Sequence, residues 1–243
     1  MTTKQGSDEE LKVLLLDIET TPCLAYIWSL WKEVGSTKMV ERDWNILCWC
    51  AMWLGSKEIM SGKADKTNDF NCLVELHKLL DEADIVIAQN GDNFDIKKIN
   101  TRLVMHGFKP PSEFRTIDTL KIARKHFKFT SNRLDDLGQY LGVGKKMDTG
   151  GFTLWRDCIN GVKGAIEKMV KYCKKDVILL EKVYLKLRPY VKNHPNMGVL
   201  KNGVACPKCG SRKVQYRGWN ITSKQRKRRL HCRSCGGWFS ENS

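Results

Sequence analysis

The chain has 243 residues, enough for one α/β domain and a small appendage. Its hydrophobic fraction of 42% and charged fraction of 28% are ordinary for a globular protein, and no apolar run approaches the length needed to cross a bilayer. The first ten residues are polar and lack the apolar stretch of a secretory signal. We therefore expect a cytoplasmic protein with no membrane partner, in the host cytoplasm if it is phage-encoded.

The net charge of +15 is concentrated near the C-terminus. Residues 196–243 hold eleven Lys and Arg and a single acidic residue, Glu241, so this segment carries +10, and the preceding 195 residues carry only +5. Such a basic segment favours a polyanionic partner, most often nucleic acid. Composition alone leaves a solvated basic tail or an anionic membrane surface as alternatives.

Hydrophobic patterning predicts strands that later alternate with helices. Strands are expected at 12–18, 46–54, 58–60 and 85–88, and helices at 68–82, 94–106, 118–126, 133–141 and 163–188. This order indicates a mixed α/β sheet flanked by helices. Pro and Gly are frequent across 189–205, which predicts a boundary. We place one domain at 11–193, a linker at 194–203 and a small module at 204–240.

The first chemical motif is Asp17-Ile18-Glu19, at the end of the first predicted strand. Side chains two residues apart in a strand share a face, so both carboxylates point the same way. Carboxylates this close repel each other and raise each other's pKa, a conflict that a hard cation such as Mg²⁺ or Mn²⁺ relieves. Alone, the motif is better explained as a solvated strand end, because Asp-x-Glu is common.

Two further motifs follow on helices. In Asn90-Gly91-Asp92-Asn93-Phe94-Asp95, Asp95 falls in the first turn of a predicted helix, where the dipole favours an anion, although Asp92 or Asn93 could act simply as N-caps. Tyr172 and Asp176 are four residues apart on the last long helix and so share a face. An ordinary surface Asp beside a half-buried Tyr is the alternative for this pair.

The order Asp-x-Glu, Asn-x-x-x-Phe-Asp and Tyr-x-x-x-Asp resembles the DEDD superfamily of 3′→5′ exonucleases over roughly residues 11–190. The second motif is most similar to the exonuclease domain of family B DNA polymerases. The stretch from Ile117 to Gly142 resembles free-standing, often phage-encoded, members. Tyr172 stands four residues before Asp176, and Lys171 occupies the position where the other branch has His, so the chain looks like the tyrosine branch.

The resemblance implies a ribonuclease H-like fold and a catalytic set of Asp17, Glu19, Asp95, Tyr172 and Asp176. The four carboxylates are expected to hold two Mg²⁺ or Mn²⁺ ions about 3.5–4 Å apart, with Asp17 bridging them. Glu19 and Asp176 would complete one site, Asp95 would hold the second ion partly through water, and Tyr172 would orient the attacking water. Asn90 and Phe94 are assigned to nucleic-acid contact. Asp118 is a further acidic candidate, which we interpret as a helix N-cap.

Four of the ten cysteines form two Cys-x-x-Cys pairs near the C-terminus: Cys206 with Cys209, and Cys232 with Cys235. Four thiolates at this spacing suit one tetrahedral structural Zn²⁺, and the segment resembles a zinc ribbon. The alternative interpretation is a redox pair or disulfides, but a four-Cys pattern in a cytosolic protein disfavours it. His231 breaks the paired spacing and is left out of the ligand set.

Between the cysteine pairs, cations alternate with aromatic residues, a composition suited to single-stranded nucleic acid. The candidate contacts are Arg217, Trp219, Lys224, Arg226, Lys227, Arg228 and Arg229. The aromatic residues of this module could instead form its small core, and we expect that role for Trp238 and Phe239.

These inferences converge on a two-metal 3′→5′ exonuclease followed by a zinc ribbon that grips nucleic acid, with DNA favoured over RNA. The same fold used as a structure-specific endonuclease or an RNase is one alternative. A nucleic-acid-binding protein with an inactive site is another, although the intact set of four carboxylates argues against it.

Overall fold

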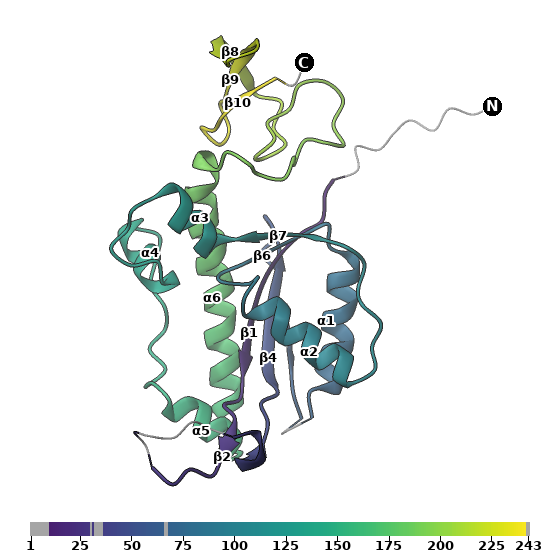
Figure 1. The fold of residues 1–243 in the computed structure, drawn as a ribbon, viewed down its shortest axis with the longest axis vertical. Helices are drawn as coiled ribbons and strands as arrows, with labels where there is room; N and C mark the ends of the chain where they lie inside the picture. Colours follow the sequence, from purple (N-terminus) through teal and green to yellow (C-terminus); the bar gives the residue numbers. More distant parts are fainter. Residues whose placement is uncertain (1–9, 30, 32–35, 66–67, 242–243) are drawn as a thin grey trace, which may run out of the picture.

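The computed structural model describes residues 10–29, 31, 36–65 and 68–241; residues 1–9, which bear on the expectation that a signal segment is absent, lie outside this set. A five-stranded mixed sheet in the order β5-β4-β1-β6-β7 forms the centre of the protein (Figure 1). Its strands are β1 (Val13–Thr20), β4 (Ile46–Trp53), β5 (Met60–Lys63), β6 (Ile85–Ala88) and β7 (Arg115–Asp118). β4 is antiparallel to β1 and β5, whereas β6 is parallel to β1 and β7. The expected class, a mixed α/β sheet flanked by helices, is confirmed.

Helices cover both faces of this sheet (Figure 1). They are α1 (Phe70–Glu82), α2 (Asp95–Met105), α3 (Thr119–His126), α4 (Leu134–Tyr140), α5 (Thr153–Ile159) and α6 (Ala165–Leu187). Alternation along β1 separates two apolar cores: Leu14 and Leu16 pack with residues of α1 and α2, whereas Val13 and Leu15 pack with α6. Asp17 and Glu19 continue the row of Val13 and Leu15, so the carboxylates of β1 face α6.

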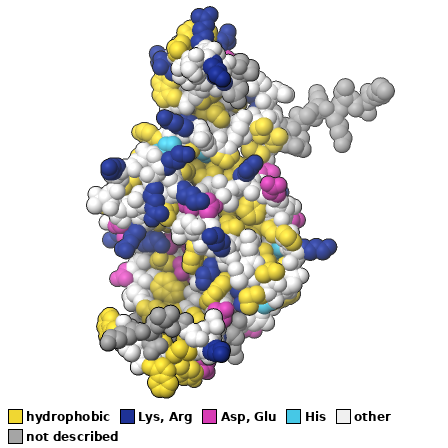
Figure 2. Space-filling view, viewed as in Figure 1, with side chains coloured by type: hydrophobic (Ala, Val, Ile, Leu, Met, Phe, Trp, Pro, Cys, Tyr) yellow, Lys and Arg dark blue, Asp and Glu magenta, His cyan; other side chains and the backbone are white. Residues whose placement is uncertain are grey.

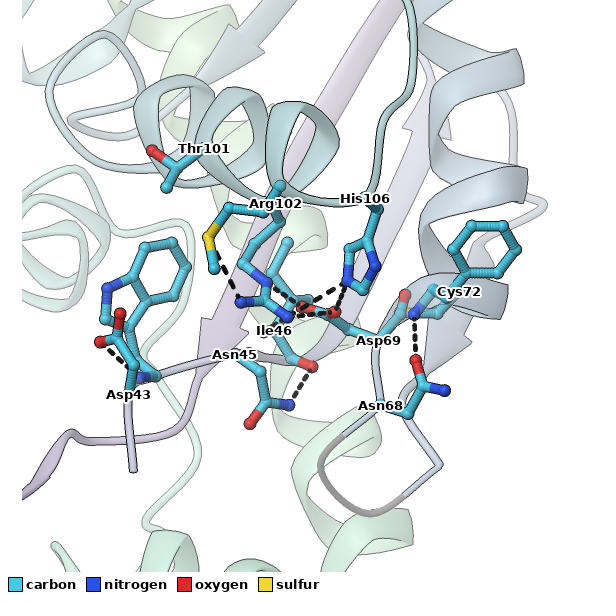
Figure 3. A network of polar contacts seen from close by, with 12 residues as sticks. Asp43, Asn45, Ile46, Asn68, Asp69, Cys72, Thr101, Arg102 and His106 are labelled. Carbon is cyan, nitrogen blue, oxygen red and sulfur yellow. Dashed lines mark hydrogen bonds and ion pairs between the residues drawn. The ribbon is translucent and has the colours of Figure 1, made fainter. Parts of the chain in front are cut away.

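A buried ion pair between Arg102 and Asp69 joins α2 to the start of α1 (Figure 3). The Asp69 carboxylate, fully buried before α1, accepts hydrogen bonds from Arg102 Nε at 2.7 Å and Nη2 at 2.8 Å and from the Ile46 N–H at 2.9 Å. His106 Nε2 lies 2.7 Å from the same carboxylate. Burial alone raises the pKa of Asp69, but these hydrogen bonds outweigh it and hold the pKa below its usual value. The pair therefore fixes the axis of α2, whose first residue is Asp95.

The long helix α6 connects the central sheet to a second, smaller sheet. It begins after Gly164, whose φ of +81° suits glycine, and is followed by a short 3₁₀ helix, η2 (Arg188–Tyr190). Beyond it lies a three-stranded antiparallel sheet in the order β10-β9-β8, built from β8 (Val214–Ile221), β9 (Arg226–Cys232) and β10 (Trp238–Ser240). No helix in the described part of the chain is both long and apolar enough to span a membrane.

The elements expected before residue 190 agree with the structure except in a few short segments, whereas β8, β9 and β10 were implied only by the resemblance to a zinc ribbon. Each expected helix is present, with ends within two residues of the expected ones. The strand expected at 58–60 lies further along the chain, as β5 at Met60–Lys63, because a turn at Leu54-Gly55 and irregular residues up to Ile59 precede it. Neither β7 nor α5 was anticipated. The four residues of β7 include two exposed polar ones, too few for a periodic pattern.

A further pair of short strands, β2 (Leu24–Ala25) and β3 (Val40–Arg42), was also missed. They belong to the excursion between β1 and β4, together with the 3₁₀ helix η1 (Thr37–Met39).

Candidate active site

Three carboxylates from two elements meet on the α6 face of the sheet. Asp17 and Glu19 lie on β1 and Asp176 on α6, and each offers an oxygen within 4.8 Å of the others. The geometry follows from the packing of α6 across β1, where the buried Cys173 Sγ lies 3.3 Å from the Asp17 carbonyl oxygen and donates to it. Three acidic groups that are remote in the sequence thus form one cluster.

Asp95, at the start of α2, contacts the backbone of the same strand β1. Its side chain is 2% exposed, and its Oδ1 accepts a hydrogen bond of 3.1 Å from the N–H of Ile18, the residue between Asp17 and Glu19. It lies in the first turn of α2, as expected, but outside the group of three carboxylates that share the 4.8 Å separation.

Burial and mutual repulsion make this cluster unfavourable for negative charge. Burial is the larger cause and the charge of Asp176 the second in raising the pKa of Asp17 to about 7. Burial and the charge of Asp17 raise the pKa of Glu19 to about 9. The pKa values of Asp95 and Asp176 are raised as well, in both cases mainly by burial. Without a counter-ion, the cluster therefore retains protons near neutral pH.

Lys146 supplies one positive charge to the cluster, and the sequence analysis did not identify it. Its Nζ lies 2.5 Å from Asp176 Oδ2 and donates to the Tyr172 hydroxyl at 2.9 Å. Burial is the largest single influence and opposes its charge. The charge of Asp176, the hydrogen bonds to Asp176 and Tyr172 and the charge of Asp17 together outweigh burial and raise the pKa of Lys146. Tyr172 and Asp176 share a helix face, as expected, and Lys146 joins them. Only the Lys145-Lys146 pair after Gly144 marked this loop in the sequence.

Two carboxylate oxygens in the cluster are buried and unpaired. Asp17 Oδ2 and Asp176 Oδ1 have no hydrogen-bond partner among the described residues. Buried acceptors of this kind are costly unless they coordinate a cation or accept a hydrogen bond. Hard oxygen donors that converge within 4.8 Å suit a divalent metal such as Mg²⁺ or Mn²⁺. The donor set and the unpaired oxygens thus fit a metal site.

A cavity of about 530 Å³ opens beside the cluster. Its lining combines Asp17 and Lys146 with Asn90, and with Arg124 and Arg133 from the α3–α4 region. Asn90 has a φ of +62°, which Asn tolerates better than most residues, and its N–H donates to Asp118 Oδ1 at 3.0 Å. The cavity therefore places carboxylates and cations around a space large enough for a nucleotide.

Asp118 and the remaining residues of the second motif take different roles. Asp118 is the N-cap of α3, accepting from the N–H groups of Leu120 and Lys121, which confirms that interpretation. The N-cap residue of α2 is Phe94, so neither Asp92 nor Asn93 caps this helix. Asp92 pairs instead with Lys121 at 2.7 Å. Phe94 is 38% exposed and, unlike Asn90, does not line the cavity.

The four C-terminal cysteines also converge. Their sulfur atoms lie within 4.8 Å of one another, with 3.8 Å between the sulfurs of Cys206 and Cys235 and 3.6 Å between those of Cys209 and Cys232. A tetrahedron with Zn–S bonds of about 2.3 Å has edges of about 3.8 Å, which these separations match. All four thiols are free. His231 is not in the cluster; its ring packs on Trp238 at 4.7 Å between centroids.

The small sheet presents its aromatic and basic residues to solvent. Trp219 is 42% exposed, and the Arg226 guanidinium lies 4.6 Å from its ring centroid. The expectation that Trp238 fills the core of this module is wrong, because its side chain is 49% exposed beside Arg229. Phe239 is partly buried and pairs across the sheet with the buried Leu230. Among the described residues, the buried hydrophobic side chains of this module are Cys206, Leu230 and Cys232, so its core is centred on the cysteine cluster rather than on a large ring.

Comparison with known proteins identifies the family. A model of the RNase H superfamily matches residues 45–188, more than half of the chain and including Asp95, Lys146, Tyr172 and Asp176. The chain therefore belongs to the RNase H superfamily, whose nucleases hydrolyse nucleic acid with divalent metals.

Structural similarity leads to the same fold. Among 153 matching solved chains is the family B DNA polymerase from the hyperthermophilic archaeon Pyrobaculum calidifontis, with a TM-score of 0.54 and 13% sequence identity. The match covers 77% of this chain but only 26% of the polymerase, so the chain corresponds to about a quarter of that protein. No curated protein matches the sequence.

The raised pKa of Glu19 predicts a pH-dependent stability of the metal-free protein. Between pH 5 and 9 the folded state retains a proton on Glu19 that the unfolded state has released, so the free energy of unfolding falls as the pH rises. Glu19→Gln has no ionisable carboxyl at this position and so lacks this contribution. Its free energy of unfolding, compared with that of the parent protein, should therefore rise as the pH increases from 5 to 9. Urea unfolding in chelator at several pH values measures this.

The exposed Glu75 provides a control, because Glu75→Gln should leave the pH slope unchanged. Identical slopes for Glu19→Gln and the parent protein would show that the Glu19 carboxyl is not protonated in the folded state.

Proposed function

We propose that this protein is a two-metal-ion 3′→5′ exonuclease of the tyrosine branch of the DEDD superfamily, acting preferentially on single-stranded DNA. The observation that carries the proposal is the convergence of Asp17, Glu19 and Asp176 beside a cation-lined cavity, with two carboxylate oxygens unpaired among the described residues. The order of the motifs along the chain and the family membership support it.

The four carboxylates would share the work of binding two divalent cations. Asp17 is central because it clusters with Asp176 and is the neighbour of Ile18, whose N–H donates to Asp95, and we assign it the bridging position. Glu19 and Asp176 would complete one site, and Asp95 the other, partly through water. When bound, the cations neutralise phosphate oxygens and lower the pKa of water.

Tyr172 and Lys146 are assigned to the substrate rather than to the metals. Burial raises the pKa of Tyr172, so its hydroxyl stays protonated and can orient the attacking water as a hydrogen-bond donor. Lys146 reaches the cluster from a loop and borders the cavity, where its ammonium can contact the scissile phosphate once a metal neutralises Asp176. Asn90 would contact the terminal nucleotide, and Phe94 the strand outside the cavity.

The C-terminal module is assigned to a zinc ribbon that binds the substrate strand. Cys206, Cys209, Cys232 and Cys235 would hold one structural Zn²⁺, which their spacing suits. We retain the division into an exonuclease domain at 11–193, a linker at 194–203 and the ribbon at 204–240. Binding is assigned to its exposed cations and aromatic residues, namely Arg217, Trp219, Lys224, Arg226, Lys227, Arg228 and Arg229.

Removal of metal or of Asp17 should abolish turnover. We expect no activity in chelator, recovery with Mg²⁺ or Mn²⁺, and a loss of about 10³-fold or more in Asp17→Ala, since several kcal/mol of charge stabilisation disappear. Oligonucleotide binding should persist, because the basic residues remain. Rates on 5′-labelled single-stranded DNA and RNA measure this, with Glu75→Ala as the control.

The same assay distinguishes the alternatives. A ladder that shortens one nucleotide at a time from the 3′ end is expected, whereas internal fragments would indicate an endonuclease and faster cleavage of RNA an RNase. Full activity in excess chelator would exclude the two-metal mechanism, and binding without any cleavage would identify an inactive homologue.

Loss of the Tyr172 hydroxyl should cost far less than loss of a metal ligand. Tyr172→Phe keeps the ring and its edge-on contact with Trp155, so we expect a rate loss of about 10²-fold or less, near the lower limit for a proton-transfer group. Lys146→Met should lower the rate as well, whereas Lys145→Met on the exposed neighbouring position should not. Single-turnover rates compare the variants with Asp176→Ala. Equal and complete loss in Tyr172→Phe and Asp176→Ala would contradict a merely orienting role.

The ribbon should supply much of the electrostatic affinity. Replacing Arg226, Lys227, Arg228 and Arg229 with Ala, or ending the chain at Lys192, should weaken binding and flatten the slope of log affinity against log salt. The quadruple variant should retain zinc, whereas Cys209→Ser or Cys232→Ser should lose it and unfold the ribbon. Titrations of one oligonucleotide at several salt concentrations, with zinc analysis, check this. An unchanged slope after truncation would mean that the ribbon binds something other than the strand.

A further inference from the structure

The small sheet is docked firmly against the end of α6. The Lys208 side chain is buried, at 4% exposure, and its Nζ donates a hydrogen bond to the carbonyl oxygen of Pro189 in η2. The Tyr184 hydroxyl lies 2.8 Å from His194 Nε2, and the Met197 N–H donates to the Pro207 carbonyl oxygen at 2.8 Å. These contacts span the end of α6, the following segment and the first cysteine pair. The module is therefore held at a set position rather than on a free tether.

The length of α6 sets the distance between the carboxylate cluster and this module. Asp176 and Leu187 are eleven residues apart in one continuous helix, which corresponds to about 17 Å at 1.5 Å per residue. The small sheet lies beyond that end of the helix (Figure 1). At the rise of about 3.4 Å per nucleotide of a stacked strand, this distance corresponds to about five nucleotides. The small sheet lies farther still, so this number is a lower limit for a strand that stays stacked.

Cations occupy the surface between the two sites. From Thr119 to Leu134 the sequence has five Lys and Arg and no carboxylate. Arg124 of this stretch lines the cavity beside Asp17, and Lys125 and Lys128 are exposed farther along. Figure 2 shows dark-blue side chains both on the small sheet and down the same face of the molecule.

The end of α3 brings this stretch to the ribbon. Phe127 packs edge-on against Tyr190 of η2, with 5.2 Å between ring centroids. Burial lowers the pKa of His126, and the nearby charges of Lys125, Lys192 and Lys208 lower it further, so cations from both parts of the chain meet here. The basic surface is thus continuous from the cavity to the ribbon.

We propose that one strand of nucleic acid lies along this surface from the cavity over α3 to the ribbon, so that the ribbon contacts phosphates about five or more nucleotides from the 3′ end. A single strand is the partner that fits, because the ribbon offers the rings of Tyr216 and Trp219, which are 49% and 42% exposed, beside its cations. The assignment of the 3′ end to the cavity rests on the proposed exonuclease function, but the spacing between the two contacts does not.

A scan with neutral phosphates tests the spacing. Three consecutive methylphosphonate linkages, which carry no charge, are placed either next to the 3′ end or about six to eight nucleotides away in a 20-nucleotide single strand. Affinity is measured without added Mg²⁺ or Mn²⁺, on protein whose zinc content is verified, at several salt concentrations. In the parent protein the distal patch should lower the salt slope by about two, because each single-strand phosphate contributes about 0.7. In the quadruple variant of Arg226, Lys227, Arg228 and Arg229 the distal patch should have no effect, whereas the proximal patch should still weaken binding.

A charge-matched control replaces Lys57, Lys78, Lys109 and Arg115, exposed residues outside this surface, and should leave the distal effect intact. A ten-residue Gly-Ser insertion after Lys192, combined with Lys208→Met to remove the contact with Pro189, should free the ribbon. The sharp dependence on patch position should then be lost while zinc is retained.

The proposal is overturned if the distal patch has no effect in the parent protein, or if its effect persists in the quadruple variant. It is also overturned if the quadruple substitution removes the proximal effect. Degradation of the unmodified strand in Mg²⁺ is followed in a parallel experiment. If the protein is not an exonuclease, this degradation assay will show it, and the binding result will still test the spacing. The direction of the strand is overturned if a patch next to the 5′ end weakens binding and a patch next to the 3′ end does not.

Discussion

The structure depends on holding several carboxylates close together in a buried position. Asp17, Glu19 and Asp176 would separate if their backbones could move, because burial and repulsion both oppose their negative charge. They stay together because β1 is the central strand, paired on both sides, and α6 packs across it. The two apolar layers therefore supply the rigidity that the charged cluster needs, and Lys146 offsets part of its charge.

The same constraint explains how charge is distributed over the protein. A site rich in carboxylates repels the phosphates on which a nuclease acts, and bound cations offset this only locally. The excess positive charge lies elsewhere, on the α3 stretch and on the small C-terminal sheet, where it can attract the strand without neutralising the cluster. A net charge of +15 is thus compatible with an acidic centre. Firm docking of the small sheet through Lys208 and His194 keeps the two regions at a constant separation.

Local periodicity determined those parts of the site that lie on regular elements. The two-residue repeat of a strand puts Asp17 and Glu19 on one face, and the four-residue spacing of a helix puts Tyr172 beside Asp176. Lys146 could not be found in this way, because it lies in an irregular loop whose path is set by packing between α4 and α6. The role of Asp69 and Arg102 was equally hidden, since an ion pair between residues 33 positions apart has no local signature.

The sequence by itself determined the fold class, every α-helix except α5, the strands β1, β4 and β6, the acidic motifs and the paired cysteines, because each depends on short-range spacing. Tertiary structure alone decided that three carboxylates converge within 4.8 Å, that Asp95 contacts the backbone of Ile18, and that Trp238 is exposed rather than buried. It also decided the pKa values of Asp17 and Glu19, which are raised chiefly by burial. Burial and charge proximity depend on which distant segments pack together, and no local pattern in the sequence records that.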